Sequence, residues 1–149
     1  MINLIKTIAC GICKGFGGGV EPSKIQHCGT IDIITASSIL LDKLDEMGSK
    51  GEVYLPDTDT KIYNLKEVES SCELKEVSSL SFVAESHDCD DFAAKLYSKF
   101  ASLAWTNIHA LNYFIDEHET FWWIEPQNKK ISKSLEPWQG AQIRFLLGR

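Results

Sequence analysis

Three residues in the last third of the sequence have the types and the order of a thiol-based catalytic site: Cys89, His109 and Glu125. A cysteine that attacks a carbonyl needs a stabilised thiolate, a nearby base and a group that fixes the tautomer of the base. Cys89 follows Asp88, a good helix N-cap, and unpaired N–H groups at a helix start favour an anion. We therefore interpret Cys89 as the nucleophile, His109 as its base and Glu125 as the residue that orients the imidazole.

The apolar pattern indicates the elements that carry these residues. Apolar side chains recur at helical spacing between residues 92 and 103 and predict a helix from 88 to about 102. Residues 108–115 and 120–124 are rich in aromatic and β-branched side chains and predict a hairpin, and a final strand is expected over 142–147. A helix followed by a run of strands is typical of an α+β fold.

The register of this hairpin decides whether His109 and Glu125 meet. Directly opposed residues of an antiparallel pair project from the same face. If Ile115 pairs with Glu119 across a three-residue turn, His109 opposes Glu125 with Cβ atoms about 5 Å apart. A four-residue turn would place the two on opposite faces. Pro126 cannot donate to a ladder, so the strand is expected to end there and to leave Glu125 at its tip.

Three short runs carry a resemblance to a known family: Asp88-Cys-Asp-Asp-Phe-Ala93, His109-Ala-Leu-Asn112 and Ile124-Glu-Pro-Gln127. They resemble the papain-like cysteine protease domain at the C-terminus of the Marasmius oreades agglutinin and related small proteins of bacteria and phages. The resemblance extends over roughly residues 50–131. It implies a papain-like fold in which the helix of the nucleophile packs on a small antiparallel sheet, with Cys89, His109 and Glu125 as the triad.

The resemblance also implies that calcium binds near the site, where Asp90 and Asp91 are the nearest carboxylates. Two departures from the family follow: the lectin portion of the agglutinin is absent, so its sugar binding does not carry over, and the oxyanion hole differs. Papain-like enzymes commonly have a glutamine about six residues before the nucleophile, and Val83 occupies that place. Gln127 or a backbone N–H near Ser86 is then the candidate for the second oxyanion donor.

These features predict a thiol-dependent peptidase or amide hydrolase, a cysteine protease that acts on a peptide or amide substrate through an acyl-enzyme. A cell-wall amidase or endopeptidase is one alternative, although Ser-Gly usually follows the cysteine there, where this chain has Asp90-Asp91. A transglutaminase-like acyl transferase is a second alternative, because it uses the same thiol chemistry. A non-catalytic binding or structural module, for example in a phage particle, is the alternative from another class. His87 competes weakly with His109 as the base.

Composition limits the partners. The 149 residues suit one domain, and a net charge of -6 without a basic cluster disfavours nucleic acid. No apolar run approaches the ~18 residues of a membrane helix. The sequence requires no cofactor. An odd count of five cysteines without a secretion signal favours reduced thiols and a cytoplasmic location, including that of a phage-encoded protein.

The N-terminal part differs from the rest in composition. Residues 1–30, with four glycines between 15 and 19, are predicted to form an N-terminal arm or helix with a Gly-rich joint, and 31–149 the hydrolase domain. Residues 31–47 predict a helix that Gly48 stops, with an opening strand as the alternative. The polar, turn-rich residues 49–88 predict short strands or extended loops, with one helical turn around Leu65–Val68. Cys10, Cys13 and His27-Cys28 invite a zinc site, which we discount because adjacent His and Cys ligands are unusual.

Overall fold

The fold is mixed α+β, and the computed structural model describes residues 24–149. Its elements follow in this order: β1 (Gly29–Asp32), α2 (Ile33–Glu46), β2 (Glu52–Tyr54), β3 (Asp59–Ile62), α3 (Leu65–Glu69), α4 (Cys72–Ser78), α5 (Cys89–Lys99), β4 (Ser102–Thr106), β5 (Ala110–Ile115), β6 (Phe121–Ile124), β7 (Ile131–Ser132), the 3-10 helix η1 (Pro137–Gln139) and β8 (Ile143–Leu147). Residues 1–23 of the predicted arm, with Cys10 and Cys13, lie outside the described residues, and the predicted boundary at residue 30 falls inside β1.

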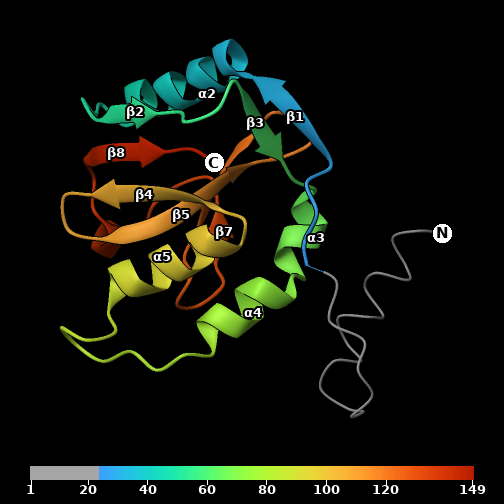
Figure 1. The fold of residues 1–149 in the computed structure, drawn as a ribbon. Helices are drawn as coiled ribbons and strands as arrows, with labels where there is room; N and C mark the ends of the chain where they lie inside the picture. Colours follow the sequence, from blue (N-terminus) through green and yellow to red (C-terminus); the bar gives the residue numbers. More distant parts are fainter. Residues whose placement is uncertain (1–23) are drawn as a thin grey trace, which may run out of the picture.

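A six-stranded sheet in the order β2-β8-β4-β5-β6-β7 forms the centre, and β1 pairs with β3 in a separate two-stranded sheet. Helix α2 covers one face of the larger sheet, while α4 and α5 lie on the other side (Figure 1). All neighbouring strands of the large sheet are antiparallel except β2 and β8, which run parallel. The sheet is therefore a middle layer with helices on both sides.

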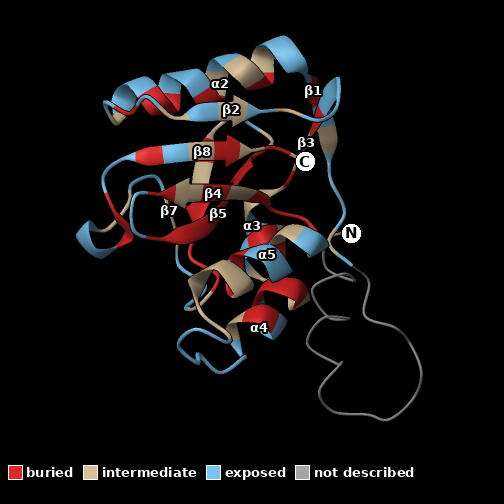
Figure 2. Ribbon diagram, turned by 60° about the vertical axis from the view of Figure 1, so that its left-hand side comes forward, coloured by how far each residue is buried: buried red, intermediate tan, exposed pale blue. Residues whose placement is uncertain are grey.

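Because successive strand residues point to opposite faces, the sheet separates two apolar cores. Phe114 and Ile124 face α3, α4 and α5, where they pack with Phe92 and Leu96. The intervening strand residues face α2 in a second core, which contains Leu40, Leu44, Leu111, Tyr113, Phe121 and Trp123. Figure 2 shows the buried strands between exposed outer faces of the helices. The rigid layers fix the strand ends that carry the candidate site.

Side-chain caps define the helix starts as the sequence suggests. The Asp32 carboxylate accepts from the backbone N–H of Thr35, and Asp88 is the N-cap of α5. Gly48 follows α2 with a φ of 61°, a conformation that glycine adopts without a Cβ penalty. The Asn112 amide then anchors α5 to the sheet, because it donates to the carbonyls of Ala93 and Ser102 at 3.0 Å each.

The hairpin register differs from the prediction. Ile115 pairs with Phe121 and not with Glu119, so the turn spans 116–120. The Asp116 carboxylate organises this longer turn, since it accepts from the backbone N–H groups of His118 and Thr120 at 2.8 and 2.9 Å. A shift of two residues preserves the face on which each side chain lies.

Two predictions about the helices were wrong. Helix α5 ends at Lys99 and not near Ser102, because the chain turns there into β4, which continues the apolar spacing as a strand. Helix α4 lies in a segment for which turns and short strands were expected. No helix within residues 24–149 has the length and apolar content to cross a membrane.

Cys28 and Cys89 are free thiols, whereas Cys72 is disulfide-bonded, which contradicts the expectation of reduced cysteines throughout.

Candidate functional site

Cys89 is the first residue of α5 and lines a pocket of about 360 Å³. The predicted base His109 and the predicted donor Gln127 line the same pocket. Its remaining walls come from the loop between α4 and α5 and from η1, through Phe82, Ala84, Glu85, Asp88 and Trp138. The fold thus brings a thiol, an imidazole and an amide from three separate segments to one cavity.

His109 and Glu125 form the hydrogen bond that the sequence predicted. His109 Nε2 lies 2.8 Å from Glu125 Oε2, and the side chains are 7% and 1% exposed. The pair does not lie directly across the ladder, because Glu125 follows the end of β6. A turn back to β7 holds Glu125, whose backbone N–H donates to the carbonyl of Lys130 and whose carbonyl accepts from Lys129.

Two further residues complete this pair, and the sequence analysis did not identify either as part of the site. The Gln139 amide donates to Glu125 Oε2 at 2.7 Å and is 3% exposed. The hydroxyl of Thr106 accepts from the backbone N–H of His109 at 2.9 Å. Glu136-Pro137 marks a helical start and could have indicated an ordered segment here, but no local pattern links it to Glu125.

Trp138, the neighbour of Gln139 in η1, packs edge-on against the His109 ring, with centroids 5.1 Å apart and planes at 65°. It nevertheless keeps 52% of its surface exposed. Phe82, on the opposite segment of the pocket wall, is 57% exposed. The two rings therefore leave apolar surface exposed on different segments of the pocket wall.

The thiol of Cys89 makes no hydrogen bond to His109 within residues 24–149. His109 Nδ1, the ring nitrogen turned from Glu125, makes none there either. The two groups share a pocket without forming a direct pair. They can each exchange a hydrogen bond with a molecule bound between them.

The two oxyanion candidates lie in different surroundings. Gln127 lines the pocket, and its backbone N–H points to Glu125 Oε1 at 3.4 Å. The backbone N–H of Ser86 instead donates to the carbonyl of Val83 at 3.1 Å, within a loop that a bridge between Val83 and His87 closes. Ser86 is therefore occupied by its own loop, while the side chain of Gln127 stays available to the pocket.

Asp90 and Asp91 do not act together at the start of α5. Asp91 accepts from the backbone N–H of Asp88 at 3.3 Å as part of the helix cap. Asp90 instead lies with Asp88 and Cys89, with possible ligand atoms within 4.8 Å of one another, and the hydrogen bond that a protonated Asp90 donates to the Asp88 carboxylate raises the pKa of Asp90. Calcium takes six to eight oxygen ligands, and two carboxylates with a thiol fit it poorly. Calcium binding stays a prediction of the resemblance.

His87 has partners outside the pocket. Its Nδ1 lies 2.9 Å from the carbonyl of Ser81 and its Nε2 lies 3.0 Å from Lys95 Nζ. A neutral ring that donates to Ser81 and accepts from Lys95 satisfies both contacts. His87 therefore holds the loop against α5 and does not compete with His109.

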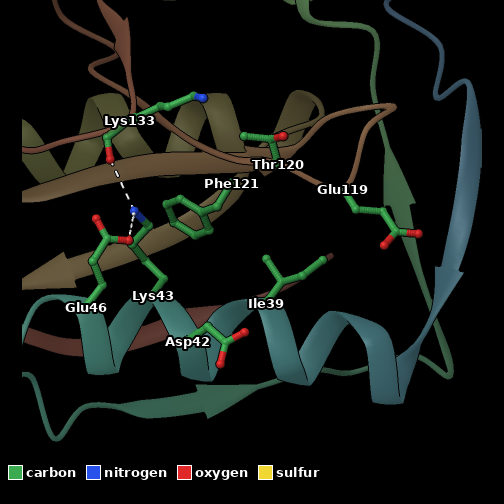
Figure 3. Close-up of a pocket in the computed structure, with 8 residues that line it drawn as sticks. All are labelled: Ile39, Asp42, Lys43, Glu46, Glu119, Thr120, Phe121 and Lys133. Atoms are coloured by element: carbon green, nitrogen blue, oxygen red, sulfur yellow. Dashed lines mark hydrogen bonds and ion pairs between the residues drawn. The ribbon is translucent and has the colours of Figure 1, made fainter.

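A second cleft, of about 320 Å³, lies between α2 and the start of β6 (Figure 3). Its buried cation, Lys43, donates to Glu46 Oε2 at 2.7 Å and to the carbonyl of Lys133 at 3.2 Å. It also lies 5.4 Å from the centroid of the Phe121 ring. The bond to Lys133 ties α2 to the segment after β7, and the contact with Phe121 ties it to β6. The cleft contains none of the predicted site residues.

Comparisons with known proteins place the fold but no family. No family model and no curated protein matches the sequence. Two solved structures of the Polyporus squamosus lectin are similar: PSL1a in complex with E64, with a TM-score of 0.66, and the lectin bound to the human-type influenza-binding epitope Neu5Acα2-6Galβ1-4GlcNAc, with a TM-score of 0.63. Each shares 20% identity over 79% of this chain, and the chain spans about half of theirs, 50% and 49%. At that identity, the similarity shows a common fold.

The comparisons contradict the prediction of a thiol-dependent peptidase. Both similar structures are of a lectin, a class defined by carbohydrate binding, and they do not support an enzyme, a hydrolase or a cysteine protease. The chain is similar in fold to part of a fungal lectin.

Proposed function

We propose that this protein is a non-catalytic binding module and that the pocket at the start of α5 binds a carbohydrate. One of the similar structures is a lectin bound to a sialylated trisaccharide. This chain corresponds to about half of that lectin, so the ligand has to be argued from the pocket itself. The papain-like arrangement implied by the resemblance stays a prediction, supported by Cys89 at the start of a helix packed on the sheet.

The arrangement of the pocket carries this proposal. Trp138 and Phe82 offer exposed aromatic surface on different segments of the wall. The apolar C–H face of a pyranose packs well against an aromatic ring, which explains why such surface suits a sugar. The volume of about 360 Å³ lies within the range of roughly 300–1,000 Å³ of small-molecule sites.

Polar groups in the same pocket match the hydroxyl groups of a sugar. Gln127 offers both a donor and an acceptor, and Asp88 and Glu85 offer acceptors. His109 adds a ring nitrogen that has no hydrogen-bond partner within the described chain. Cys89 and His109 form no hydrogen bond with one another in the described chain, and a ligand between them can bond to both.

Isothermal titration with Neu5Acα2-6Galβ1-4GlcNAc tests the proposal. Trp138→Ala is expected to weaken binding at least about tenfold, the scale of a central aromatic contact. Tyr54→Ala is the matched control, because Tyr54 is 49% exposed on β2, outside the pocket, and its loss should leave the affinity unchanged. Equal affinities of the two variants, or no binding by the wild type, would contradict the proposal.

Incubation with E64, the ligand named with PSL1a, tests the non-catalytic part. Intact-mass spectrometry should show an unchanged protein mass. A mass increase that Cys89→Ser abolishes would reveal a reactive thiol and overturn the proposal, as would turnover of a peptide or of the bound oligosaccharide.

A further inference from the structure

A chain of buried polar residues lies behind the pocket histidine. Thr106, Glu125 and Gln139 are 0%, 1% and 3% exposed. Buried polar groups are retained at a cost unless each finds a partner, and here they bond to one another and to His109. Their arrangement fixes which atom of His109 carries the proton.

The orientation of the Gln139 amide is set by a backbone donor. Gln139 Oε1 accepts from the backbone N–H of Glu136 at 2.8 Å, and an N–H can only donate. Gln139 Nε2 is therefore the atom that faces Glu125 Oε2 at 2.7 Å. The same oxygen lies 2.8 Å from His109 Nε2.

Thr106 holds the backbone on the other side of the ring. Its hydroxyl donates to the carbonyl of Gln139 at 2.7 Å and accepts from the backbone N–H of His109 at 2.9 Å. His109 and Gln139 are thus linked twice: Thr106 bonds to the backbone groups of both, and Glu125 bonds to both side chains. Trp138 packs against the ring between them and limits its rotation.

We propose that Gln139 is a positioning residue that keeps His109 in the tautomer with the proton on Nε2, so that Nδ1 presents a lone pair to the pocket and selects ligands with a hydroxyl or N–H donor at that point. Two N–H donors, from Gln139 and the backbone of Gln127, point at the Glu125 carboxylate and hold it in place beside His109 Nε2. The inference that Nδ1 selects a ligand with a hydrogen-bond donor rests on the proposed carbohydrate site, whereas the inference about the tautomer of His109 does not.

Nitrogen-15 NMR of the unliganded protein near pH 8 tests the tautomer. The two-bond correlations of His109 should identify Nε2 as the protonated nitrogen and Nδ1 as the unprotonated one. Gln139→Leu should lower the fraction of His109 that carries the proton on Nε2, because Glu125 then loses the donor that holds its Oε2 in place; an unchanged fraction in a folded variant would overturn the role of Gln139. Gln142→Leu, at an exposed position three residues away, should leave the pattern of the wild type. A wild type with the proton on Nδ1 would overturn the proposal, even if Gln139→Leu failed to fold.

Mono-O-methyl analogues of Neu5Acα2-6Galβ1-4GlcNAc test the ligand class. O-methylation removes the donor of a hydroxyl and keeps its acceptor. We expect one position at which it weakens binding to the wild type about three- to tenfold and has a smaller effect in Gln139→Leu. No such position would overturn the selection of a donor by His109. If the trisaccharide does not bind at all, the proposed carbohydrate function fails while the NMR result still decides the role of Gln139.

Discussion

Replacing Glu125 by alanine should destabilise the protein more than any single exposed carboxylate would. Glu125 Oε2 accepts from the side chains of His109 and Gln139, and all three residues are buried. Alanine leaves both donors without an acceptor, and each buried unsatisfied group costs about 1–3 kcal/mol. We expect a loss of about 3–4 kcal/mol in the free energy of unfolding, a large part of the ~5–15 kcal/mol of a typical domain.

Glu125→Gln separates the acceptor from the charge. The amide oxygen can occupy the position of Oε2 and accept from His109 and Gln139. The amide NH2 group then takes the place of Oε1, which removes only the long hydrogen bond that Oε1 accepts from the Gln127 N–H at 3.4 Å. We expect a loss of about 1 kcal/mol, the size of one ordinary hydrogen bond. Glu69→Ala, at an exposed position in α3, is the control and should change stability by less than about 0.5 kcal/mol.

Urea unfolding followed by tryptophan fluorescence measures these differences, because Trp123 is buried in the core and becomes exposed on unfolding. The urea concentration at the unfolding midpoint should be highest for Glu69→Ala, lower for Glu125→Gln and lowest for Glu125→Ala. The dependence of the free energy of unfolding on urea concentration should be the same for all three variants. A midpoint of Glu125→Ala equal to that of Glu69→Ala would refute the reasoning. Equal losses for Glu125→Gln and Glu125→Ala would show that the negative charge, and not the position of the acceptor, matters.

Three further changes probe the frame around the site by urea unfolding. Gly51→Ala places a Cβ 2.5 Å from the backbone carbonyl oxygen of Ile143 and should lower the free energy of unfolding by about 2–3 kcal/mol. In the control Gly148→Ala, the Cβ clashes only with the flexible side chain of Leu55, and the loss should be less than about 1 kcal/mol. Equal losses for the two variants would contradict this reasoning. Burial raises the pKa of Tyr113 above its usual 10.0, so above that pH the unfolded chain loses a proton that the folded one keeps, and stability should fall as pH rises. Tyr113→Phe should reduce the drop between pH 9 and 11, and an unchanged drop would exclude Tyr113 as its source. Lys43→Met keeps the apolar stem but loses two hydrogen bonds, and should lower stability by about 1–2 kcal/mol at low and high salt alike; no loss would show that these bonds do not hold α2.

The sequence predicted the local parts of the site because local rules govern them. Asp88 as an N-cap and the apolar spacing after it indicated the start of α5 and so the place of Cys89. The pairing of His109 with Glu125 also followed from the hairpin, although the turn is longer than expected. The pair survived the error in register because a shift of two residues keeps the side-chain face.

The rest could not be predicted because it depends on contacts between distant segments. Gln139 lies 14 residues after Glu125, and only the folded chain brings η1 against the end of β6. Strand β4 was missed because Phe100 and Leu103 continue the helical spacing of α5, and tertiary pairing with β5 and β8 overrides that pattern. The prediction of a peptidase was contradicted by the similarity to lectin structures, because residue types in a suitable order identify a possible site and not its ligand.

The position of β8 has a consequence for the order in which the sheet is assembled. This strand follows all other strands in the sequence, yet it lies inside the sheet between β2 and β4. β2 and β4 are neighbours of β8 and not of one another, so the sheet can close only when β8 is in place. Without residues 140–149, both strands would keep an open edge, and such edges pair readily with other chains. Deleting this segment should therefore yield aggregates and not a slightly shortened protein.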